Sequence, residues 1–172
     1  MSVSHLAAIL HDEATWLRAL QSPARDLPPR QRTLYHAIAW SYSLLDANTQ
    51  IIFRQLGIFV GGFMIEAAEA ICGADLPTLA RLSDHSLLAY LPERWRMLEM
   101  IREFALTQMS VAERTAAQQR HVAYFASQTQ MDLDAVARDY DNFRAALEWA
   151  IAAHNTHAAL LLYFKLSWLC ET

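Results

Sequence analysis

The stretch that decides the fold of this chain is Leu27-Pro28-Pro29-Arg30-Gln31-Arg32-Thr33-Leu34, continued by Ala39-Trp40-Ser41-Tyr42-Ser43-Leu44-Leu45-Asp46. A proline disfavours helical backbone in the residue before it, so the two prolines predict a boundary between elements. A helix is then expected over about residues 31–45, with one apolar stripe of Leu34, Ile38, Ser41 and Leu45. Asp46 can accept hydrogen bonds from free backbone N–H groups, so it predicts the start of the next helix.

Hydrophobic spacing predicts the elements on either side of this stretch. Helices are expected over residues 3–20, after Asp46 until Gly61-Gly62, and over residues 65–72, 76–83, 98–109, 110–130, 138–153 and 156–171, with a connection over 131–136. Ser110 followed three residues later by Glu113 forms a capping box that marks one of these starts. Two short extended runs, residues 86–90 and 94–97, flank the turn Leu91-Pro92-Glu93 and predict a β-hairpin. The expected fold class is therefore mainly α with one small hairpin.

Composition narrows the class of protein. The 172 residues are 54% hydrophobic and 19% charged, with four glycines and five prolines, which favours a packed and mostly helical chain. A net charge of −4 gives no general attraction to nucleic acid or to an anionic membrane. Cys72 and Cys170 lie far apart in apolar pattern, as expected of buried free thiols in a reducing cytoplasm. Since no apolar run could span a bilayer and no signal peptide is evident, we expect a cytoplasmic protein without a membrane partner.

Four blocks of sequence carry a resemblance to a known family. They are the opening stretch; residues 52–63, ending in Gly61-Gly62-Phe63, with Glu66-Ala67-Ala68-Glu69; residues 79–88 with 96–105; and Asp141-Asn142-Phe143-Arg144-Ala145-Ala146-Leu147-Glu148-Trp149. In this order they resemble the winged helix and the start of the tetratricopeptide-like sensor of bacterial STAND signal-transduction ATPases, which have a nucleotide-binding NB-ARC core. The resemblance implies a winged-helix domain over residues 27–109 and antiparallel tetratricopeptide-like helices over 110–172. Hydrophobic spacing predicts an N-terminal helix and linker over residues 1–26.

The ATPase chemistry of that family is not expected in this chain. A phosphate-binding loop needs glycines followed by Lys and Ser or Thr, whereas the single lysine, Lys165, lies in an apolar helix without a nearby glycine. The positions that match the family's Met-His-Asp motif are Met97, Leu98 and Glu99, and leucine cannot donate a hydrogen bond to phosphate. The chain is therefore predicted not to be an enzyme, and no catalytic, cofactor-binding or metal-binding residue is assigned.

Other candidate sites have simpler structural explanations. Gly61-Gly62 could bind an anion before a helix, but a tight turn that packs Phe59 and Phe63 into the core is favoured. His154 and His157 are three residues apart, but Asn155 suggests a helix break between them. The isolated residues His36, His85 and His121 add no convergent ligands, so no metal is expected. Cys72 has no recognisable sequence signature of a nucleophile.

DNA binding is the main alternative, because winged helices often place a helix in the major groove. The candidate recognition helix carries only Arg81, between Asp75 and Asp84, and the wing adds Arg94 and Arg96 beside Glu93. Few phosphate contacts are therefore expected. Arg25, Arg30 and Arg32 are interpreted as a solvated linker rather than a clamp on an acidic partner. The aromatic residues are expected in the core rather than stacked on bases: Trp40, Tyr42, Trp95, Trp149 and Trp168.

The sequence thus favours a non-catalytic regulatory module of a STAND-type ATPase or transcription regulator. It would transmit the conformational state of a nucleotide-binding core to a sensor, and its partner would be a protein. The alternatives are a small DNA-binding winged-helix transcription regulator and a remnant that folds without activity.

Overall fold

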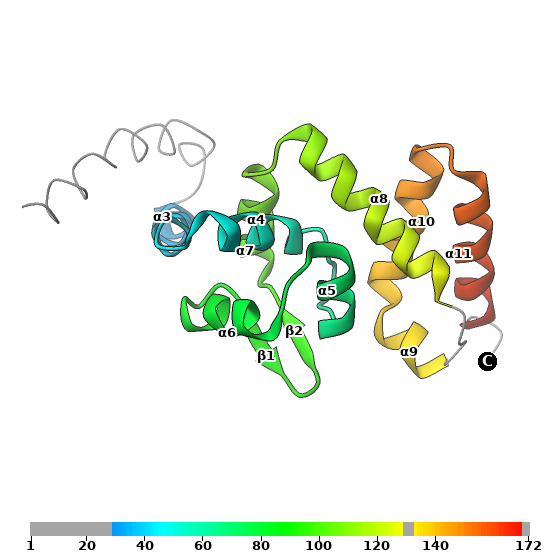
Figure 1. The fold of residues 1–172 in the computed structure, drawn as a ribbon, viewed down its shortest axis with the longest axis horizontal. Coiled ribbons are helices and arrows are strands. Elements are labelled where there is room, and N and C mark those ends of the chain that lie inside the picture. Colours follow the sequence, from blue (N-terminus) through cyan, green and yellow to red (C-terminus); the bar gives the residue numbers. More distant parts are fainter. Residues whose placement is uncertain (1–28, 129–132, 170–172) are drawn as a thin grey trace, which may run out of the picture.

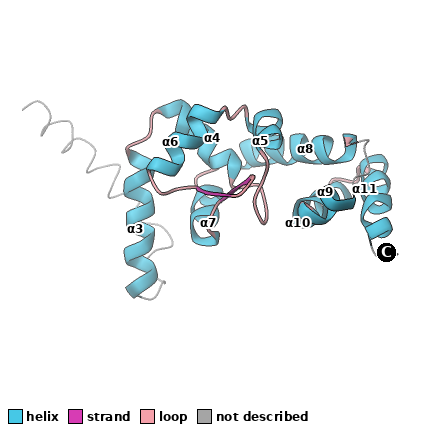
Figure 2. Ribbon diagram, turned by 90° about the horizontal axis from the view of Figure 1, so that it is seen from below, coloured by secondary structure: helices cyan, strands magenta, loops and turns pink. Residues whose placement is uncertain are grey.

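The computed structural model describes residues 29–128 and 133–169 (Figures 1 and 2). The helix expected over residues 3–20 lies outside this range, as do Arg25 and Cys170. The elements are α3 (Pro29–Ser43), α4 (Ala47–Leu56), α5 (Ile65–Cys72), α6 (Leu76–Asp84), β1 (Ala89–Leu91), β2 (Arg94–Arg96), α7 (Glu99–Thr107), α8 (Val111–Ser127), α9 (Leu133–Arg138), α10 (Tyr140–Ala152) and α11 (Thr156–Leu169). The predicted fold class, mainly α with a small hairpin, is confirmed.

Helices α4, α5 and α6 followed by the hairpin have the order of a winged helix. Strands β1 and β2 are antiparallel, with Tyr90 opposite Trp95 and a two-residue turn in which Glu93 is left-handed (φ 69°). The first predicted run is too long, since Ser86 (φ 58°) belongs to the turn after α6. Phe63 also exchanges two backbone hydrogen bonds with Trp95, of 2.8 and 2.9 Å. The sequence did not predict this third short segment of the sheet.

Helix α3 begins at Pro29, two residues before the predicted start, because proline is tolerated in the first turn of a helix. Its buried side holds Tyr35 and Ile38, whereas Leu34, expected in the core, is 45% exposed. The rings of Tyr35 and Tyr42 pack on Phe104 of α7, with centroids 5.2 and 5.5 Å apart. Ile38 and Leu45 are therefore buried as predicted, whereas Tyr35 takes the buried place expected for Leu34.

Two other large apolar residues are exposed, Ile51 at 41% and Leu98 at 62%, while the neighbouring side chains of Ile52 and Phe53, and of Ile101 and Phe104, fill the interior. The prediction that Trp40 lies in the core is wrong, since it is 49% exposed. The other expected core aromatics fit better, because Trp95 is buried and Tyr42 and Trp149 are partly buried against the core; the side chain of Trp168 lies outside the description.

The two predicted helix starts at Asp46 and Ser110 are confirmed. The Asp46 carboxylate accepts hydrogen bonds from the Thr49 backbone N–H (2.9 Å) and hydroxyl (2.8 Å), and these bonds lower the pKa of Asp46. Ser110 Oγ accepts from the Glu113 N–H at 3.1 Å. Such caps satisfy backbone donors that the helix itself leaves free.

After α8 the chain forms a second packed group. Figure 1 shows α10 and α11 side by side, next to the C-terminal part of α8. The short helix α9 lies where a connection over 131–136 was predicted, because six residues are too few for a helical period to be visible. The break at Asn155 is confirmed: His154 is left-handed (φ 55°), and the Asn155 side chain caps α11 by accepting from the Ala158 N–H at 3.1 Å.

The turn between α4 and Phe63 requires glycine at both central positions. Gly61 and Gly62 have φ of 77° and 106°, and a Cβ atom on Gly62 would lie 2.8 Å from the Trp95 carbonyl oxygen. The turn brings the buried rings of Phe59 and Phe63 to a centroid distance of 4.6 Å. This confirms the predicted tight turn that packs Phe59 and Phe63 into the core.

Candidate interface between the winged helix and the helical segment

We call α3–α7 the winged-helix part and α8–α11 the helical segment. The most buried polar contact between them is made by Asn142 of α10, whose side chain has no exposed surface. Its Nδ2 donates to the Gly62 carbonyl oxygen at 2.8 Å, and its Oδ1 accepts from the Val60 N–H at 2.8 Å. One amide therefore satisfies a backbone donor and a backbone acceptor on the same glycine turn. Asn142 belongs to the fourth block of the resemblance and Gly62 to the second, 80 residues earlier.

An ion pair extends this contact to the hairpin. Arg94 of β2 binds Asp139, which precedes α10, at 2.9 Å, and the two side chains are only 16% and 18% exposed. Asp139 also accepts from Asn142 at 3.2 Å. Arg94 was predicted to lie on the wing as a possible DNA contact, but it faces the helical segment instead. Its Nη1 atom is buried without a hydrogen-bond partner in the described part of the chain.

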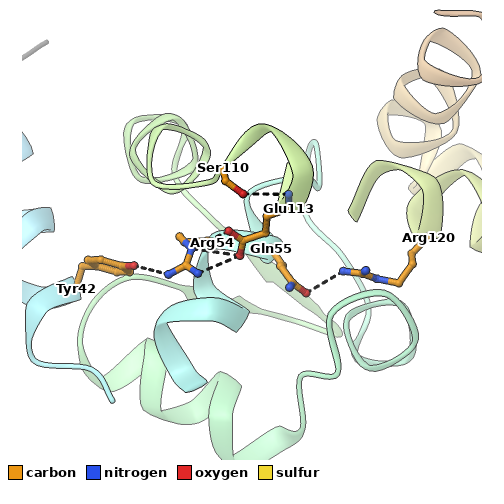
Figure 3. Close-up of polar contacts among 6 residues, drawn as sticks. All are labelled: Tyr42, Arg54, Gln55, Ser110, Glu113 and Arg120. Carbon is orange, nitrogen blue, oxygen red and sulfur yellow. Dashed lines mark hydrogen bonds and ion pairs between the residues drawn. The ribbon is translucent and has the colours of Figure 1, made fainter. Parts of the chain in front are cut away.

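A second polar contact fastens the start of α8 to the winged-helix part (Figure 3). Arg54 of α4 lies between Tyr42 and Glu113, donating to the Tyr42 hydroxyl at 2.8 Å and to the Glu113 carboxylate at 3.1–3.3 Å. In a capping box the Glu side chain usually returns to the backbone of the capping residue. Here the Glu113 carboxylate binds the partly buried guanidinium of Arg54, which is the stronger partner.

Further along α8, Arg120 reaches α4 and α5. Its Nε donates to the Ile71 carbonyl oxygen at 2.6 Å, and its Nη2 donates to Gln55 Oε1 at 3.0 Å. Ile71 is in the last turn of α5, where a helix leaves carbonyl groups without partners and favours a positive charge. Helix α8 is thus held to the winged-helix part at both Glu113 and Arg120.

His121 lies at the centre of the same junction. Its ring packs against Phe59, Phe125 and Trp149, with centroid distances of 5.5, 4.6 and 5.0 Å. The residue has no exposed surface, and neither ring nitrogen has a hydrogen-bond partner within the described residues. Burial lowers the pKa of this imidazole to about 3, so it is neutral at physiological pH. In the sequence His121 was only an isolated histidine, because its aromatic neighbours come from three different elements.

The outer side of the winged helix carries an open groove between α6 and the hairpin. Its volume is about 510 Å³, and apolar residues, including Leu76, Ala80 and Tyr90, form much of its lining. Asp84 and Glu93 also line it, and neither carboxylate forms an ion pair within the described residues. This is the side on which a DNA-reading winged helix presents its recognition helix.

The other predicted candidates are spread over the surface or are structural. Arg81 pairs with Asp46 in an exposed ion pair, Asp75 caps α6, and Arg96 is exposed. Arg30 and Arg32 lie in the first turn of α3, and their side chains lie outside the description. Cys72 is buried, which raises the pKa of its thiol to about 12.

The positions that match the Met-His-Asp motif lie at a small pocket of about 60 Å³, which Met97 and Glu99 line together with Gly61, Gly62, Arg96 and Arg102. Met97 is buried, Leu98 is 62% exposed, and the Glu99 carboxylate binds Arg102 at 2.7 Å. Among the described residues, no three His, Cys, Asp or Glu side chains gather closely enough to hold a metal ion. None of the described helices combines the length and apolarity that crossing a bilayer requires.

Comparison with known proteins finds relatives that are much longer than this chain. Over 155 residues the chain is 34% identical to a protein of Mycobacterium tuberculosis and Mycobacterium bovis that is provisionally named an HTH-type transcriptional regulator. The match covers 77% of this chain but only 18% of that protein. Over 92 residues the chain is also 27% identical to an uncharacterized protein of the same two species, covering 46% of this chain and 23% of the relative. No protein-family model and no solved structure matches. The chain is thus homologous to one segment of a much longer regulator.

Replacement of Asn142 tests the main contact. In Asn142→Leu the Val60 N–H and the Gly62 carbonyl lose their partner while remaining buried, so we expect a loss of about 2–5 kcal/mol in the free energy of unfolding. Urea denaturation followed by circular dichroism measures it. The matched control is Asn155→Ala, which removes an exposed helix cap and should cost about 1 kcal/mol. Equal losses in the two variants would contradict the role given to Asn142.

Because the imidazole of His121 is buried, we expect the unfolding free energy to fall as the pH is lowered. The unfolded chain binds a proton at this residue below pH 6.5, whereas the folded chain does so only near pH 3. Folding therefore loses about 1.4 kcal/mol per pH unit from this group as the pH falls through that range. His121→Leu should flatten the dependence of the unfolding free energy on pH between 6.5 and 4, while the exposed control His157→Gln should leave it in place. An unchanged slope in His121→Leu would show that other groups cause the acid sensitivity.

Proposed function

We propose that this chain is a non-catalytic part of a cytoplasmic transcription regulator of the STAND type. In this proposal the winged-helix part binds another protein surface, such as a nucleotide-binding core, and the helical segment begins the sensor. The chain transmits a change of state between the two. The homology to a segment of a named transcriptional regulator and the resemblance of the four sequence blocks support this assignment.

The observation that carries the proposal is the chemistry of the groove beside α6. Protein–DNA contacts depend on Lys and Arg side chains that neutralise phosphates. Here the exposed side of α6 and the hairpin presents Leu76, Ala80 and Tyr90, with Asp84 and Glu93 among them. An apolar surface with unpaired carboxylates repels phosphate and suits a protein partner with apolar and basic side chains.

The contacts between the winged-helix part and the helical segment support the proposed transmission of a change of state. Asn142, Arg94 and Asp139 connect the hairpin, the glycine turn and α10 through buried or nearly buried hydrogen bonds. A displacement of the hairpin by a bound partner would break these bonds unless α10 moved with it. Because broken buried polar contacts are costly, movement as one body is favoured over local deformation.

DNA binding is the second candidate function. It is supported by the name of the mycobacterial relative, by the winged-helix order, and by the exposed positions of Arg81 and Arg96. The relative is far longer than the matched segment, so its DNA-binding part need not be this one. With Arg94 bound to Asp139 and Arg81 paired with Asp46, this surface offers few cations for phosphate contacts.

A salt titration of duplex binding separates the two candidates. At physiological salt we expect a dissociation constant for labelled duplexes no lower than about 10⁻⁴ M, because this surface offers few cations for phosphate contacts. Each such contact would contribute only about −0.9 to the slope of log K against log salt. Fluorescence anisotropy across a salt series, with a library of random duplexes, measures both quantities. The double variant Arg81→Ala/Arg96→Ala should behave like the unmodified chain. Tight, sequence-selective binding that falls steeply with salt and is lost in the double variant would favour the DNA-binding function.

A further inference from the structure

A pocket lies where helices of the two parts of the chain meet. Residues of α5 in the winged-helix part line it, together with residues from the end of α8 and from α9, α10 and α11 in the helical segment. Its volume is about 330 Å³, within the range of sites that bind small molecules. Of the polar residues that connect the two parts, only Asp139 belongs to this lining. The contacts described above therefore leave the pocket unexplained.

The lining includes Lys165 of α11, the one Lys or Arg that is buried among the described residues, at 8% exposed. Its amine donates to the carbonyl oxygens of Phe125 at 3.0 Å and Ala126 at 2.6 Å, in the last turn of α8. These two bonds leave the third N–H of the ammonium group without a partner. No carboxylate of residues 29–128 or 133–169 forms an ion pair with it.

Capping of α8 does not by itself account for this burial. A lysine can donate to the last carbonyls of a helix while its charge stays in water, because its long stem lets the amine reach solvent. Lysines are almost never buried without a paired anion, since loss of hydration disfavours the charge. Burial lowers the pKa of the Lys165 amine for that reason. The pocket thus contains a buried cation whose counter-ion is missing from the described chain.

Two further hydrogen-bond donors line the pocket beside this amine. Arg138 of α9 forms no ion pair within the part of the chain that the structure describes. Tyr124 of α8 is half-buried, and burial, followed by the charges of Asp139 and Glu66, raises the pKa of its hydroxyl. That hydroxyl therefore keeps its proton and can donate. Two cations and a hydroxyl form a donor set that suits a carboxylate.

The acidic residues of the lining do not cancel this preference. Asp139 is already bound by Arg94 at 2.9 Å and by Asn142 at 3.2 Å, so its charge is compensated. Glu66 is exposed, and solvent screens its charge. The pocket therefore presents two cations without ion pairs, Lys165 and Arg138, against a single exposed carboxylate.

The rest of the lining limits the body of a ligand. Ala67, Val136 and Phe143 line the pocket and are buried, so they offer apolar contacts without hydrogen bonds. At about 30 Å³ for each non-hydrogen atom, as in liquid water, the space holds on the order of ten such atoms. It is too small for a helix, which is about 10 Å across with its side chains. A segment of protein could place no more than a single side chain in it.

We propose that this pocket binds a small organic carboxylate with an apolar body, whose carboxylate group is the counter-ion of Lys165. The apolar body packs on Ala67, Val136 and Phe143, and Arg138 and Tyr124 are the further donors to the carboxylate. Because both parts of the chain line the pocket, the ligand stabilises their contact. The inference goes beyond the proposed function and does not depend on it.

Titration of the full chain, labelled with ¹⁵N, tests the proposal. The probes are hexanoate, benzoate and phenylacetate, and each is compared with its neutral amide in ¹H–¹⁵N correlation spectra. At least one carboxylate should cause saturable shifts centred on the amides of Ala67, Val136 and Phe143, with a dissociation constant between about 10 µM and 1 mM, as expected for a ligand of this size. Its amide should bind at least about tenfold more weakly, because it lacks the charge that Lys165 requires.

Two variants connect binding to the pocket. Lys165→Met keeps an apolar stem and removes the charge, so the affinity for the carboxylate should fall at least about tenfold while that for the amide is retained. The matched control is Arg144→Met, which removes an exposed cation of α10 outside the lining and should leave both affinities unchanged. If Lys165→Met proves unfolded by circular dichroism, Ala135→Phe fills the pocket from a half-buried position and should abolish binding with Lys165 in place.

Four outcomes would overturn the inference. Absence of saturable shifts with all three carboxylates up to about 10 mM would indicate that Lys165 only caps α8. Equal affinity for a carboxylate and its amide would show an apolar cavity that does not recognise charge. Shifts centred on residues outside the lining would place the binding elsewhere. Unchanged carboxylate affinity in folded Lys165→Met, or in Ala135→Phe where that variant replaces it, would remove this pocket from the interaction.

Discussion

The arrangement of the two parts of this chain depends on one side chain, the amide of Asn142. It donates to the carbonyl of Gly62 and accepts from the N–H of Val60, so it fits only a backbone that presents both groups on one side. The two glycines create that backbone, since side chains rarely adopt their φ angles of 77° and 106°, and a Cβ atom on Gly62 would lie 2.8 Å from the Trp95 carbonyl oxygen. The same turn positions Phe63 to pair with Trp95, and thereby positions Arg94 to bind Asp139. Sheet, hairpin and α10 are consequently fixed by one local constraint.

The sequence was informative wherever the cause was local. Asp46, Ser110 and Asn155 could be identified as helix boundaries because caps act within three residues, and the two glycines indicated their turn. It was uninformative wherever the partner was distant. Asn142 and Gly62 are 80 residues apart, and Arg54 and Glu113 are 59 apart, so no spacing rule could join them. On α3 the burial of Tyr35 in place of Leu34 could not be predicted, because Phe104, on which Tyr35 packs, lies on another helix.

The charges between the two parts of the chain and the charges on its outer surface both favour a protein partner over DNA. Arg94, which spacing alone assigned to the wing surface, is bound by Asp139. The groove beside α6 keeps Asp84 and Glu93 without ion pairs within the described residues. Arg94 therefore serves an interior contact of this winged helix, while the groove on its outer side is lined by apolar and acidic residues and the exposed Arg81 is paired with Asp46. That distribution suits a module placed between proteins in a regulator better than one that reads DNA directly, and it fits a chain homologous to a short segment of a long regulator.

We expect the winged-helix part and the helical segment to move and unfold as one body. Native-state hydrogen exchange across a series of low denaturant concentrations tests this expectation, because it resolves the opening of separate parts of a fold. The most protected amides of α4, α5, α8 and α10, together with those of Phe63 and Trp95, should converge on a single opening free energy. An opening of α10 and α11 at lower free energy, with the protection of α4, α5 and the hairpin unchanged, would contradict it.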